Sequence, residues 1–292
     1  MAALDLRNEL SRDIIEKMLV CPVCKEGFGV SDDGRSLVCT SGHCFDGGAG
    51  GYVSLVRNGG GGDSKEAVRA RKSFLGKGYY APAADALCKI AEELVPSGGL
   101  LVDAGCGEGY YSNKLAEQGF LVFGADISKF AADSAAKGAR QSRVARNATE
   151  SSTLFSVASV FDLPLRDGCA DCVVNIFAPC CAEEYARVLK RDGVLIVAAA
   201  GKDHLLEMKQ VIYDDAYLND TRKDLPTEEY FELCECRNSS FEITATGKED
   251  IESLFSMTPY YWRTSTDGKA RLSACDTLRT RVSFDFFIYK RK

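Results

Sequence analysis

Five short apolar segments recur from residue 99 onward, and more polar segments separate them. They are GLLVDAG (99–105), FLVFGAD (120–126), LFSVASV (154–160), DCVVNIF (171–177) and GVLIVAA (193–199). Apolar runs of this length, each bounded by turn residues or by a helical pattern, predict buried β-strands.

Three of the separating segments, 110–118, 128–146 and 181–190, are helix candidates. Strands and helices that alternate along a chain predict an α/β fold, with a mostly parallel sheet and helices on both of its faces. A late segment, RVSFDFFIY (281–289), places apolar side chains at every second position. That period predicts an edge or antiparallel last strand.

The first 57 residues differ in composition from the rest. Residues 1–20 carry apolar side chains spaced by four, which predicts a short amphipathic helix. The four are Leu6, Leu10, Ile14 and Met18. Residues 21–57 are rich in Cys and Gly, with too little apolar mass for a core of their own. The following NGGGGD (58–63) is typical of a flexible linker. We therefore expect three parts, at 1–57, 58–80 and 81–292.

Composition and charge narrow the class of protein. No apolar run approaches the ~18–20 residues that a membrane helix needs. Residues 1–20 carry four acids and no signal-peptide pattern, so we expect a cytoplasmic protein without membrane association. The net charge is −6, opposite in sign to that of proteins that hold long nucleic acids by bulk charge. Any contact with RNA must therefore come from local patches.

Two short pairs of soft metal ligands lie near the N-terminus. Cys21 and Cys24 form a CxxC pair, and after 14 residues Cys39 and His43 form a CxxxH pair. Four such ligands predict a closed, structural zinc site that folds a small zinc-ribbon-like module. Cys44 leaves the fourth ligand open. The alternatives are incidental cysteines and a redox CxxC, which lacks its usual strand-to-helix context here.

A glycine-rich turn, DAGCGEG (103–109), leaves the first predicted strand and enters a helix. Gly105, Gly107 and Gly109 allow a sharp turn and a close approach of backbone to a ligand. Asp103 precedes the turn. Asp126 ends the next strand, where an acid can accept hydrogen bonds from both ribose hydroxyls of a nucleoside. Together they are typical of a class I S-adenosylmethionine-dependent methyltransferase; a turn without a ligand is the alternative.

Three further polar residues are candidates for the site. Asp162 follows the third strand, where the fold commonly contacts adenine, and a helix or turn cap is an equal alternative. Asn175, with Ala178 and Pro179, ends the fourth strand and should border the transferred methyl group. His204 begins a helix and either serves the site or caps that helix.

Local patches for RNA are also visible. The segment from Lys65 to Lys77 holds five basic residues beside three aromatic ones, a combination that suits phosphate contact and base stacking. They are Lys65, Arg69, Arg71, Lys72 and Lys77, with Phe74, Tyr79 and Tyr80. A solvated helix face is the alternative. A second cluster, YYWR (260–263), either walls a base pocket or packs on the sheet edge.

These segments together resemble the RlmA-type 23S rRNA (guanine-N1-)-methyltransferases from about Cys21 onward. Order and spacing both agree, and IFAPC and HLLEMK separate this family from methyltransferases in general. The segments are CPVC with C-x3-H, GYVSLV (51–56), ARKSFLGKGYY (70–80), DAGCGEGYYS (103–112), GADISK (124–129), IFAPC (176–180), GKDHLLEMK (201–209) and MTPYYWR (257–263). Two departures are the extra residues 1–20 and a DGGAGG (46–51) without the expected basic residue.

The resemblance implies a Rossmann-like enzyme that methylates N1 of a guanine in a hairpin loop of large-subunit rRNA. It implies S-adenosylmethionine as cofactor, contacted by Tyr80, the Glu108–Gly109 turn, Asp126 and His204. It also implies a homodimer that clasps RNA between two zinc modules.

The chemistry leaves several points open. N1 of guanine carries a proton that must leave, and Asp162, Asn175 and His204 are candidates to orient or accept it. Methyl transfer to N1 needs no covalent adduct, so Cys180 and Cys181 are expected to pack. The alternative functions are a methyltransferase for a small metabolite and a non-catalytic RNA- or ribosome-binding protein that keeps the cofactor pocket.

Overall fold

A computed structural model describes residues 6, 11–56, 61–147, 151–221, 225–226 and 228–292. Most of the first ten positions of the predicted N-terminal helix, including Leu10, lie outside the described residues. So do residues 57–60, which include the start of the predicted glycine linker.

Within the described ranges, eight strands form one sheet in the order β10-β11-β9-β8-β5-β6-β7-β4. Strands β4 to β9 run parallel, and β10 and β11 are antiparallel to their neighbours. The strands are β4 (Val53–Ser54), β5 (Leu100–Ala104), β6 (Leu121–Asp126), β7 (Thr153–Val157), β8 (Ala170–Ile176), β9 (Leu189–Ala200), β10 (Phe231–Thr246) and β11 (Thr277–Arg291). The predicted α/β, Rossmann-like fold with an antiparallel last strand is confirmed.

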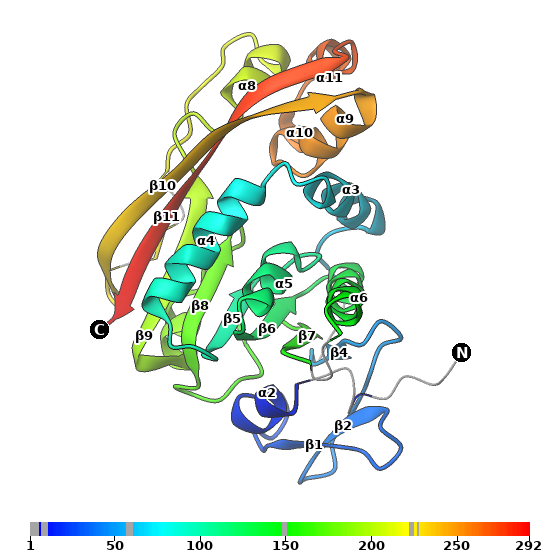
Figure 1. The fold of residues 1–292 in the computed structure, drawn as a ribbon, viewed down its shortest axis with the longest axis vertical. Coiled ribbons are helices and arrows are strands. Elements are labelled where there is room, and N and C mark those ends of the chain that lie inside the picture. The colour runs from blue at the N-terminus through cyan, green and yellow to red at the C-terminus, as the bar shows by residue number, and fades with distance from the viewer. Residues whose placement is uncertain (1–5, 7–10, 57–60, 148–150, 222–224, 227) are drawn as a thin grey trace.

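Helices cover both faces of this sheet (Figure 1). The three predicted helices are present as α5, α6 and α7. The helices after the linker are α3 (Lys65–Gly76), α4 (Ala81–Leu94), α5 (Tyr110–Glu117), α6 (Lys129–Ala145), α7 (Ala182–Val188), α8 (Leu206–Ile212), α9 (Lys248–Ser256), α10 (Tyr260–Arg263) and α11 (Thr266–Ser273). Figure 1 places α3 beside α9 at one end of the sheet.

The two faces of β5 show how period-two alternation builds the core. Val102 and Ala104 enter a cluster with α2 and α7, whereas Leu101 enters a cluster with α4, α5 and β11. Each of these β5 side chains is fully buried. Burial on both faces explains why the strand reads as an unbroken apolar run.

Strand β10 is the large element that the apolar pattern did not indicate. It pairs with β11 along its length, from Phe231 opposite Arg291 to Thr246 opposite Thr277. Because β10 is an edge strand and most of its side chains are exposed, its sequence shows no regular alternation of apolar residues. β11 is therefore an inner strand of the sheet.

The N-terminal part packs against this sheet (Figure 1). Helix α2 (Arg12–Lys17) begins at Ser11, whose hydroxyl accepts a hydrogen bond from the Ile14 amide. The side chains of Leu6, Ile14 and Met18 are fully buried in the core cluster that also contains β5 side chains. Among the described residues of the predicted helix over 1–20, α2 therefore covers Arg12–Lys17.

A small antiparallel sheet follows α2, and it has the order β1-β2-β3. Its strands are β1 (Phe28–Val30), β2 (Ser36–Cys39) and β3 (Cys44–Asp46). The next strand, β4, leaves this unit and pairs with β7 of the large sheet. None of the described helices is long and apolar enough to cross a membrane.

Candidate active site and metal centre

A cavity of about 470 Å³ opens where β5, β6, β7 and β8 end. Parallel strands point their carboxyl ends to one edge, and ligands of open α/β sheets bind there. The volume is within the range of small-molecule sites. Six of the predicted cofactor residues line it: Tyr80, Asp103, Gly105, Gly107, Glu108 and Asp126.

The glycine turn forms the floor of the cavity. Gly105 has φ of +86°, and a Cβ there would overlap the Cβ of Ala178. Its amide donates to the Ala125 carbonyl oxygen at 2.8 Å, and the Cys106 amide donates to the same oxygen at 3.0 Å. These bonds hold the turn against the end of β6. The turn therefore needs glycine both for its backbone conformation and for the closeness of Ala178.

Gly109, the last glycine of the turn, lies at the start of α5. Its φ is +80°, it stands at the N-cap of α5, and a Cβ would lie 2.7 Å from Ala135 Cβ. This glycine lets α5 pack against α6, and it is not among the residues that line the cavity.

Four carboxylates line the cavity, and burial raises the pKa of three of them. Asp103 accepts a short hydrogen bond from the Ser112 hydroxyl, and burial raises its pKa to about 7. Burial also raises the pKa of Glu108 and of Asp126. The fourth is Asp63. A site with this charge favours a ligand that carries positive charge.

Asp126 is held by two backbone amides. Its Oδ2 accepts from the Gly107 amide at 3.0 Å, and its Oδ1 accepts from the Ser128 amide at 2.7 Å. Each carboxylate oxygen can accept a second hydrogen bond. The carboxylate is thus fixed in place and can still accept hydrogen bonds from ribose hydroxyls.

His204 lies behind the cavity wall and does not line the cavity. Its ring packs edge-on against Tyr80, with centroids 6.3 Å apart, and 5.8 Å from the ring of Phe177. Its Nδ1 meets the backbone of Ser283. Burial lowers its pKa to about 4, so the imidazole is neutral at pH 7.

Asn175 is also turned away from the cavity. Its Nδ2 donates to the Pro179 carbonyl oxygen at 3.1 Å and to the Tyr185 hydroxyl at 2.9 Å. The Tyr185 hydroxyl donates in turn to the same Pro179 oxygen. This network fixes the turn after β8, whose residues Ala178 and Pro179 line the cavity, whereas Asn175 does not.

Asp162 lies on the surface, and its side chain is not part of the cavity lining. The carboxylate is 62% exposed and pairs with Lys25 Nζ at 3.3 Å. Its backbone amide donates to the Ser159 carbonyl oxygen. Asp162 thus belongs to the loop after β7, and its carboxylate contacts the N-terminal metal-ligand turn through Lys25.

Two aromatic residues at the cavity carry a signal that sequence reasoning missed. Phe161 is 60% exposed and Phe177 is 51% exposed, and both line the cavity. Phe177 has φ of +54°, an unusual value for a phenylalanine, and its ring lies 4.9 Å from that of Phe284. Both follow strand ends, a position that could have suggested a role.

The basic segment on α3 divides into inward and outward residues. Arg71 lines the cavity, and Lys77 pairs with Asp250 of α9. Lys65, Arg69 and Lys72 are exposed. In the second aromatic cluster Tyr260 is buried and Trp262 is 83% exposed, whereas the nearby Met257 lines the cavity.

The four predicted metal ligands converge. The ligand atoms of Cys21, Cys24, Cys39 and His43 all lie within 4.8 Å of one another. Cys24 Sγ is 3.5 Å from Cys39 Sγ, and Cys21 Sγ is 3.7 Å from His43 Nδ1. A tetrahedron with Zn–S bonds of about 2.3 Å separates its ligands by roughly 3.8 Å. The donor set and spacing therefore fit a structural zinc ion.

Each ligand pair is held by a tight turn. The Val23 amide donates to Cys21 Sγ, and the His43 amide donates to Cys39 Sγ. Lys25 and Gly42 adopt positive φ in these turns, with values of +63° and +84°. Cys44 is exposed on β3 and lies outside the cluster, so His43 is the fourth member of the cluster that could hold a metal ion.

The metal-ligand turns rest on the loop after β7. The Val20 amide donates to the Pro164 carbonyl oxygen at 3.0 Å, and the Arg166 amide donates to the Met18 carbonyl oxygen at 2.8 Å. The ion pair between Lys25 and Asp162 adds a third link. The same loop supplies Phe161 to the cavity, so the two sites share one supporting segment.

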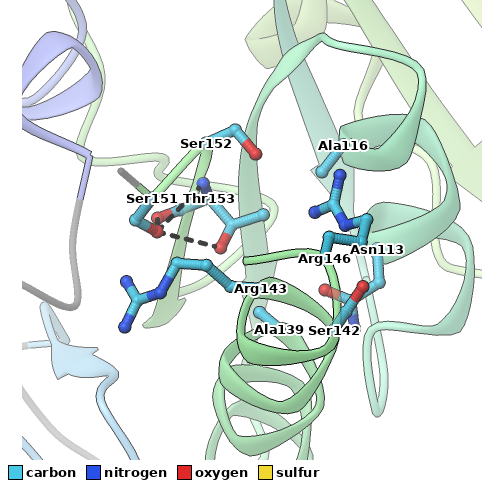
Figure 2. Close-up of a pocket in the computed structure, with 9 residues that line it drawn as sticks. All are labelled: Asn113, Ala116, Ala139, Ser142, Arg143, Arg146, Ser151, Ser152 and Thr153. Atoms are coloured by element: carbon cyan, nitrogen blue, oxygen red, sulfur yellow. Dashed lines mark hydrogen bonds between the residues drawn. The ribbon is translucent and has the colours of Figure 1, made fainter. Parts of the chain in front are cut away.

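A much smaller hollow lies at the opposite, amino-terminal edge of the sheet (Figure 2). It is about 10 Å³ in volume and is lined by Asn113 and Ala116 of α5, by the last turns of α6 and by residues 151–153 at the start of β7. Figure 2 shows Ser151 hydrogen-bonded to Thr153 beside Arg143. The space is near the minimum for a single water molecule, so it holds no organic ligand.

Comparison with known proteins agrees with this geometry. Residues 102–197 match the "Methyltransferase domain" family. A 23S rRNA (guanine(748)-N(1))-methyltransferase from Streptomyces fradiae is 34% identical over 68% of this chain and 68% of its own length. A Micromonospora griseorubida protein, described as a "Putative 23S rRNA (guanine-N(1)-)-methyltransferase", is 31% identical over 88% of this chain and 90% of its own. YxjB from Bacillus subtilis (strain 168), described in the same words, is 28% identical over 96% of this chain and 99% of its own. The chain belongs to the 23S rRNA (guanine-N1-)-methyltransferase family.

Proposed function

We propose that this protein transfers a methyl group from S-adenosylmethionine to N1 of a guanine in 23S rRNA. The observation that carries the proposal is the acid-lined, glycine-floored cavity at the sheet edge, in a chain whose relatives are named for this reaction. An rRNA substrate also agrees with the predicted cytoplasmic location.

The residues of the cavity fit this cofactor. Asp126 is available to the ribose hydroxyls, and the glycine turn admits the ligand close to the backbone. The buried Oε2 of Glu108 has no hydrogen-bond partner among the described residues, so the cavity keeps an acceptor for a cationic group. When bound, the cofactor supplies a methyl group on a positively charged sulfur, which acidic walls favour.

The guanine must enter as an unpaired base, because its N1 lies on the Watson–Crick edge. Phe161 and Phe177 line the cavity and are each more than half exposed, and exposed aromatic rings stack on single-stranded bases. An unpaired base in a hairpin loop suits this arrangement. We assign these two rings to hold the guanine plane, which leaves its N1 edge to face the methyl group.

Two of the polar residues proposed for catalysis, His204 and Asn175, position other residues of the cavity wall. His204, neutral at pH 7, supports the rings of Tyr80 and Phe177, and Asn175 fixes the Pro179 turn. Transfer then depends chiefly on alignment of the base with the methyl group. The N1 proton leaves to water at the open mouth of the cavity, and Asp162 remains a candidate acceptor only if its loop moves.

RNA outside the cavity meets the exposed residues of α3 and the N-terminal module. Lys65, Arg69 and Lys72 are available to phosphates, and Trp262 offers a further ring. The family resemblance predicts that two protomers pair and hold RNA between their zinc modules, and this stays a prediction.

The test uses zinc-loaded protein, labelled S-adenosylmethionine and unmodified 23S rRNA, followed by primer extension. Methylation at N1 blocks pairing, so we expect one strong stop at a hairpin guanine. Phe177→Ala should lower kcat/KM for RNA by about 10- to 100-fold, which is the usual worth of one stacked base. Phe130→Ala is the matched control, because Phe130 is 49% exposed on α6 and lies outside the cavity lining.

Label in RNA without a stop would place the methyl group on another atom and contradict the proposal. Bound cofactor without label in RNA would favour a small-molecule substrate or a binding protein. Equal losses in the two phenylalanine variants would contradict the assignment of Phe177 to the base.

A further inference from the structure

Arg71 is the one basic side chain among the described residues that line the cavity. It faces the four carboxylates of Asp63, Asp103, Glu108 and Asp126. An arginine so placed is either a permanent counterion or the recognition group for an anion. The contacts of its guanidinium distinguish these two roles.

The guanidinium is only partly engaged by its neighbours. Nη2 lies 2.6 Å from Asp63 Oδ2, which is close ion-pair geometry. Nη1 lies 3.7 Å from Glu108 Oε2, which is beyond hydrogen-bond distance. Its side chain is 24% exposed. A guanidinium carries five N–H donors, so Arg71 can still take a bidentate partner.

Helix α3 fixes where Arg71 points. Ser64 caps the helix by accepting from the Ala67 amide at 3.2 Å, and Val68, Phe74 and Leu75 are its buried face. Rigid packing of this helix brings the Arg71 guanidinium to the glycine turn, where a Cβ on Gly107 would lie 3.2 Å from Nη1. The cation is therefore positioned on the cavity before any ligand arrives.

Glu108 is a second cavity residue whose polar atoms lack a full set of partners. Its side chain is 5% exposed, and its Oε2 has no hydrogen-bond partner among the described residues. A buried carboxylate oxygen left without a donor is costly, because desolvation is not offset. The cavity therefore holds an unfilled donor group and an unfilled acceptor atom 3.7 Å apart.

We propose that Arg71 binds the α-carboxylate of S-adenosylmethionine and that Glu108 binds its α-ammonium group. This inference rests on the cofactor named in the proposed function. The cofactor carries two cationic groups and one anionic group. Among the described residues that line the cavity, which include four carboxylates, Arg71 is the one group with which the anionic group pairs favourably.

Asp63 is the competitor for Arg71. Its side chain is 43% exposed, so its carboxylate returns to water at little cost when the ligand carboxylate takes its place. Asp63→Asn removes this competition. The variant should therefore bind ligands that contain the amino-acid group more tightly than the wild-type protein does.

Calorimetric titration of the zinc-loaded full chain tests the assignment without any turnover. The probes are S-adenosylhomocysteine, which has the amino-acid group, and 5′-methylthioadenosine, which lacks it. Arg71→Met should weaken S-adenosylhomocysteine by about 10- to 100-fold, the usual loss for hydrogen bonds to a charged partner, and leave methylthioadenosine unchanged. Arg69→Met, on the exposed face of the same helix, should change neither.

The outcomes separate the two proposals. Equal weakening of both probes by Arg71→Met would overturn the carboxylate assignment and leave the cofactor proposal intact. A wild-type protein that binds neither probe would overturn both. If Arg71→Met does not fold, Asp63→Asn decides: a severalfold gain for S-adenosylhomocysteine alone supports the assignment, and no gain contradicts it.

Discussion

The metal centre and the acid-lined cavity are both ligand sites, but the chain builds them in opposite ways. The four metal ligands lie between Cys21 and His43 on two tight turns. The cavity draws its walls from α3, from the turns after β5, β6, β7 and β8, and from the end of α9. The first is therefore local in sequence, whereas the second exists only when the whole sheet is folded.

This difference has an energetic consequence. A local metal site adds the binding free energy of its ion to the folding of its module. Here Cys21 and Cys39 also lie in an apolar cluster that the module shares with the large sheet. The cavity depends on two large apolar clusters that no single residue dominates. Yet the sites are not independent, because the metal-ligand turns and the Phe161 loop share backbone hydrogen bonds.

Loss of the metal should have the largest effect. Cys21→Ser removes a ligand from the module, so we expect the module to unfold and rRNA methylation to be abolished. Binding of S-adenosylhomocysteine should survive, because the glycine turn and Asp126 are held by the large sheet. Zinc content, circular dichroism and calorimetry on the same preparation check the three statements.

Cys44→Ser is the matched control, since Cys44 is exposed and outside the cluster. It should keep both zinc and activity. Loss of cofactor binding in Cys21→Ser would mean that the module is needed to hold the loop after β7, and the two sites would then be one unit.

The second prediction concerns pH and the wall behind the cavity. Burial holds the pKa of His204 at about 4, below its ordinary 6.5, so the folded state prefers the neutral ring. The stability that this preference contributes is present in full above pH 6.5. It is lost as the pH falls from 6.5 to 4, and amounts to about 3 kcal/mol.

His204→Gln cannot titrate, so the difference in unfolding free energy between wild type and variant should shrink by that amount between pH 7 and pH 4. Chemical denaturation at both pH values measures it. His43, the other histidine, is present in both proteins, and its contribution cancels. A difference that is constant with pH would show that His204 is solvated, contrary to its burial.

The same contrast explains how much the sequence could predict. The spacing of Cys21, Cys24, Cys39 and His43 was sufficient, because all four act within two local turns. The glycine turn and Asp126 were also predictable, since strand ends and positive-φ glycines leave a local pattern. Strand β10 was not, because an exposed edge strand is defined by its pairing with β11 and not by apolar alternation.

Arg71 shows the limit most clearly. From sequence it is one of five basic residues on a helix, and nothing local separates it from Arg69 or Lys72. Only the packing of α3 beside the glycine turn decides which of them faces the cavity. Asn175 and His204 show the converse. A strand-end position suggested a direct role for Asn175 and the family resemblance suggested one for His204, but neither side chain is among the residues that line the cavity.

A substitution in the cavity floor should have a smaller effect, on ligand binding. Gly105→Ala combines a φ of +86° with overlap on Ala178, so it should push the turn after β8 outward. Strain of this kind costs about 1–3 kcal/mol. We expect S-adenosylhomocysteine to bind roughly 10- to 100-fold more weakly, by calorimetry. Gly119→Ala, with φ of +93° and open space around it, should lower the melting temperature without changing binding.

The smallest effect is expected at Asp162, where the two sites meet. Its exposed pair with Lys25 is of a kind worth about 0–1 kcal/mol, and its carboxylate is outside the cavity lining. Asp162→Asn should therefore change kcat/KM for rRNA by less than about threefold, and Lys25→Met should match it. A general base would instead contribute roughly 100-fold or more. A large loss of kcat/KM in Asp162→Asn alone would show that the loop after β7 moves this carboxylate into the cavity when RNA binds. A large loss of kcat/KM in both variants would show that the metal module holds that loop in its active position.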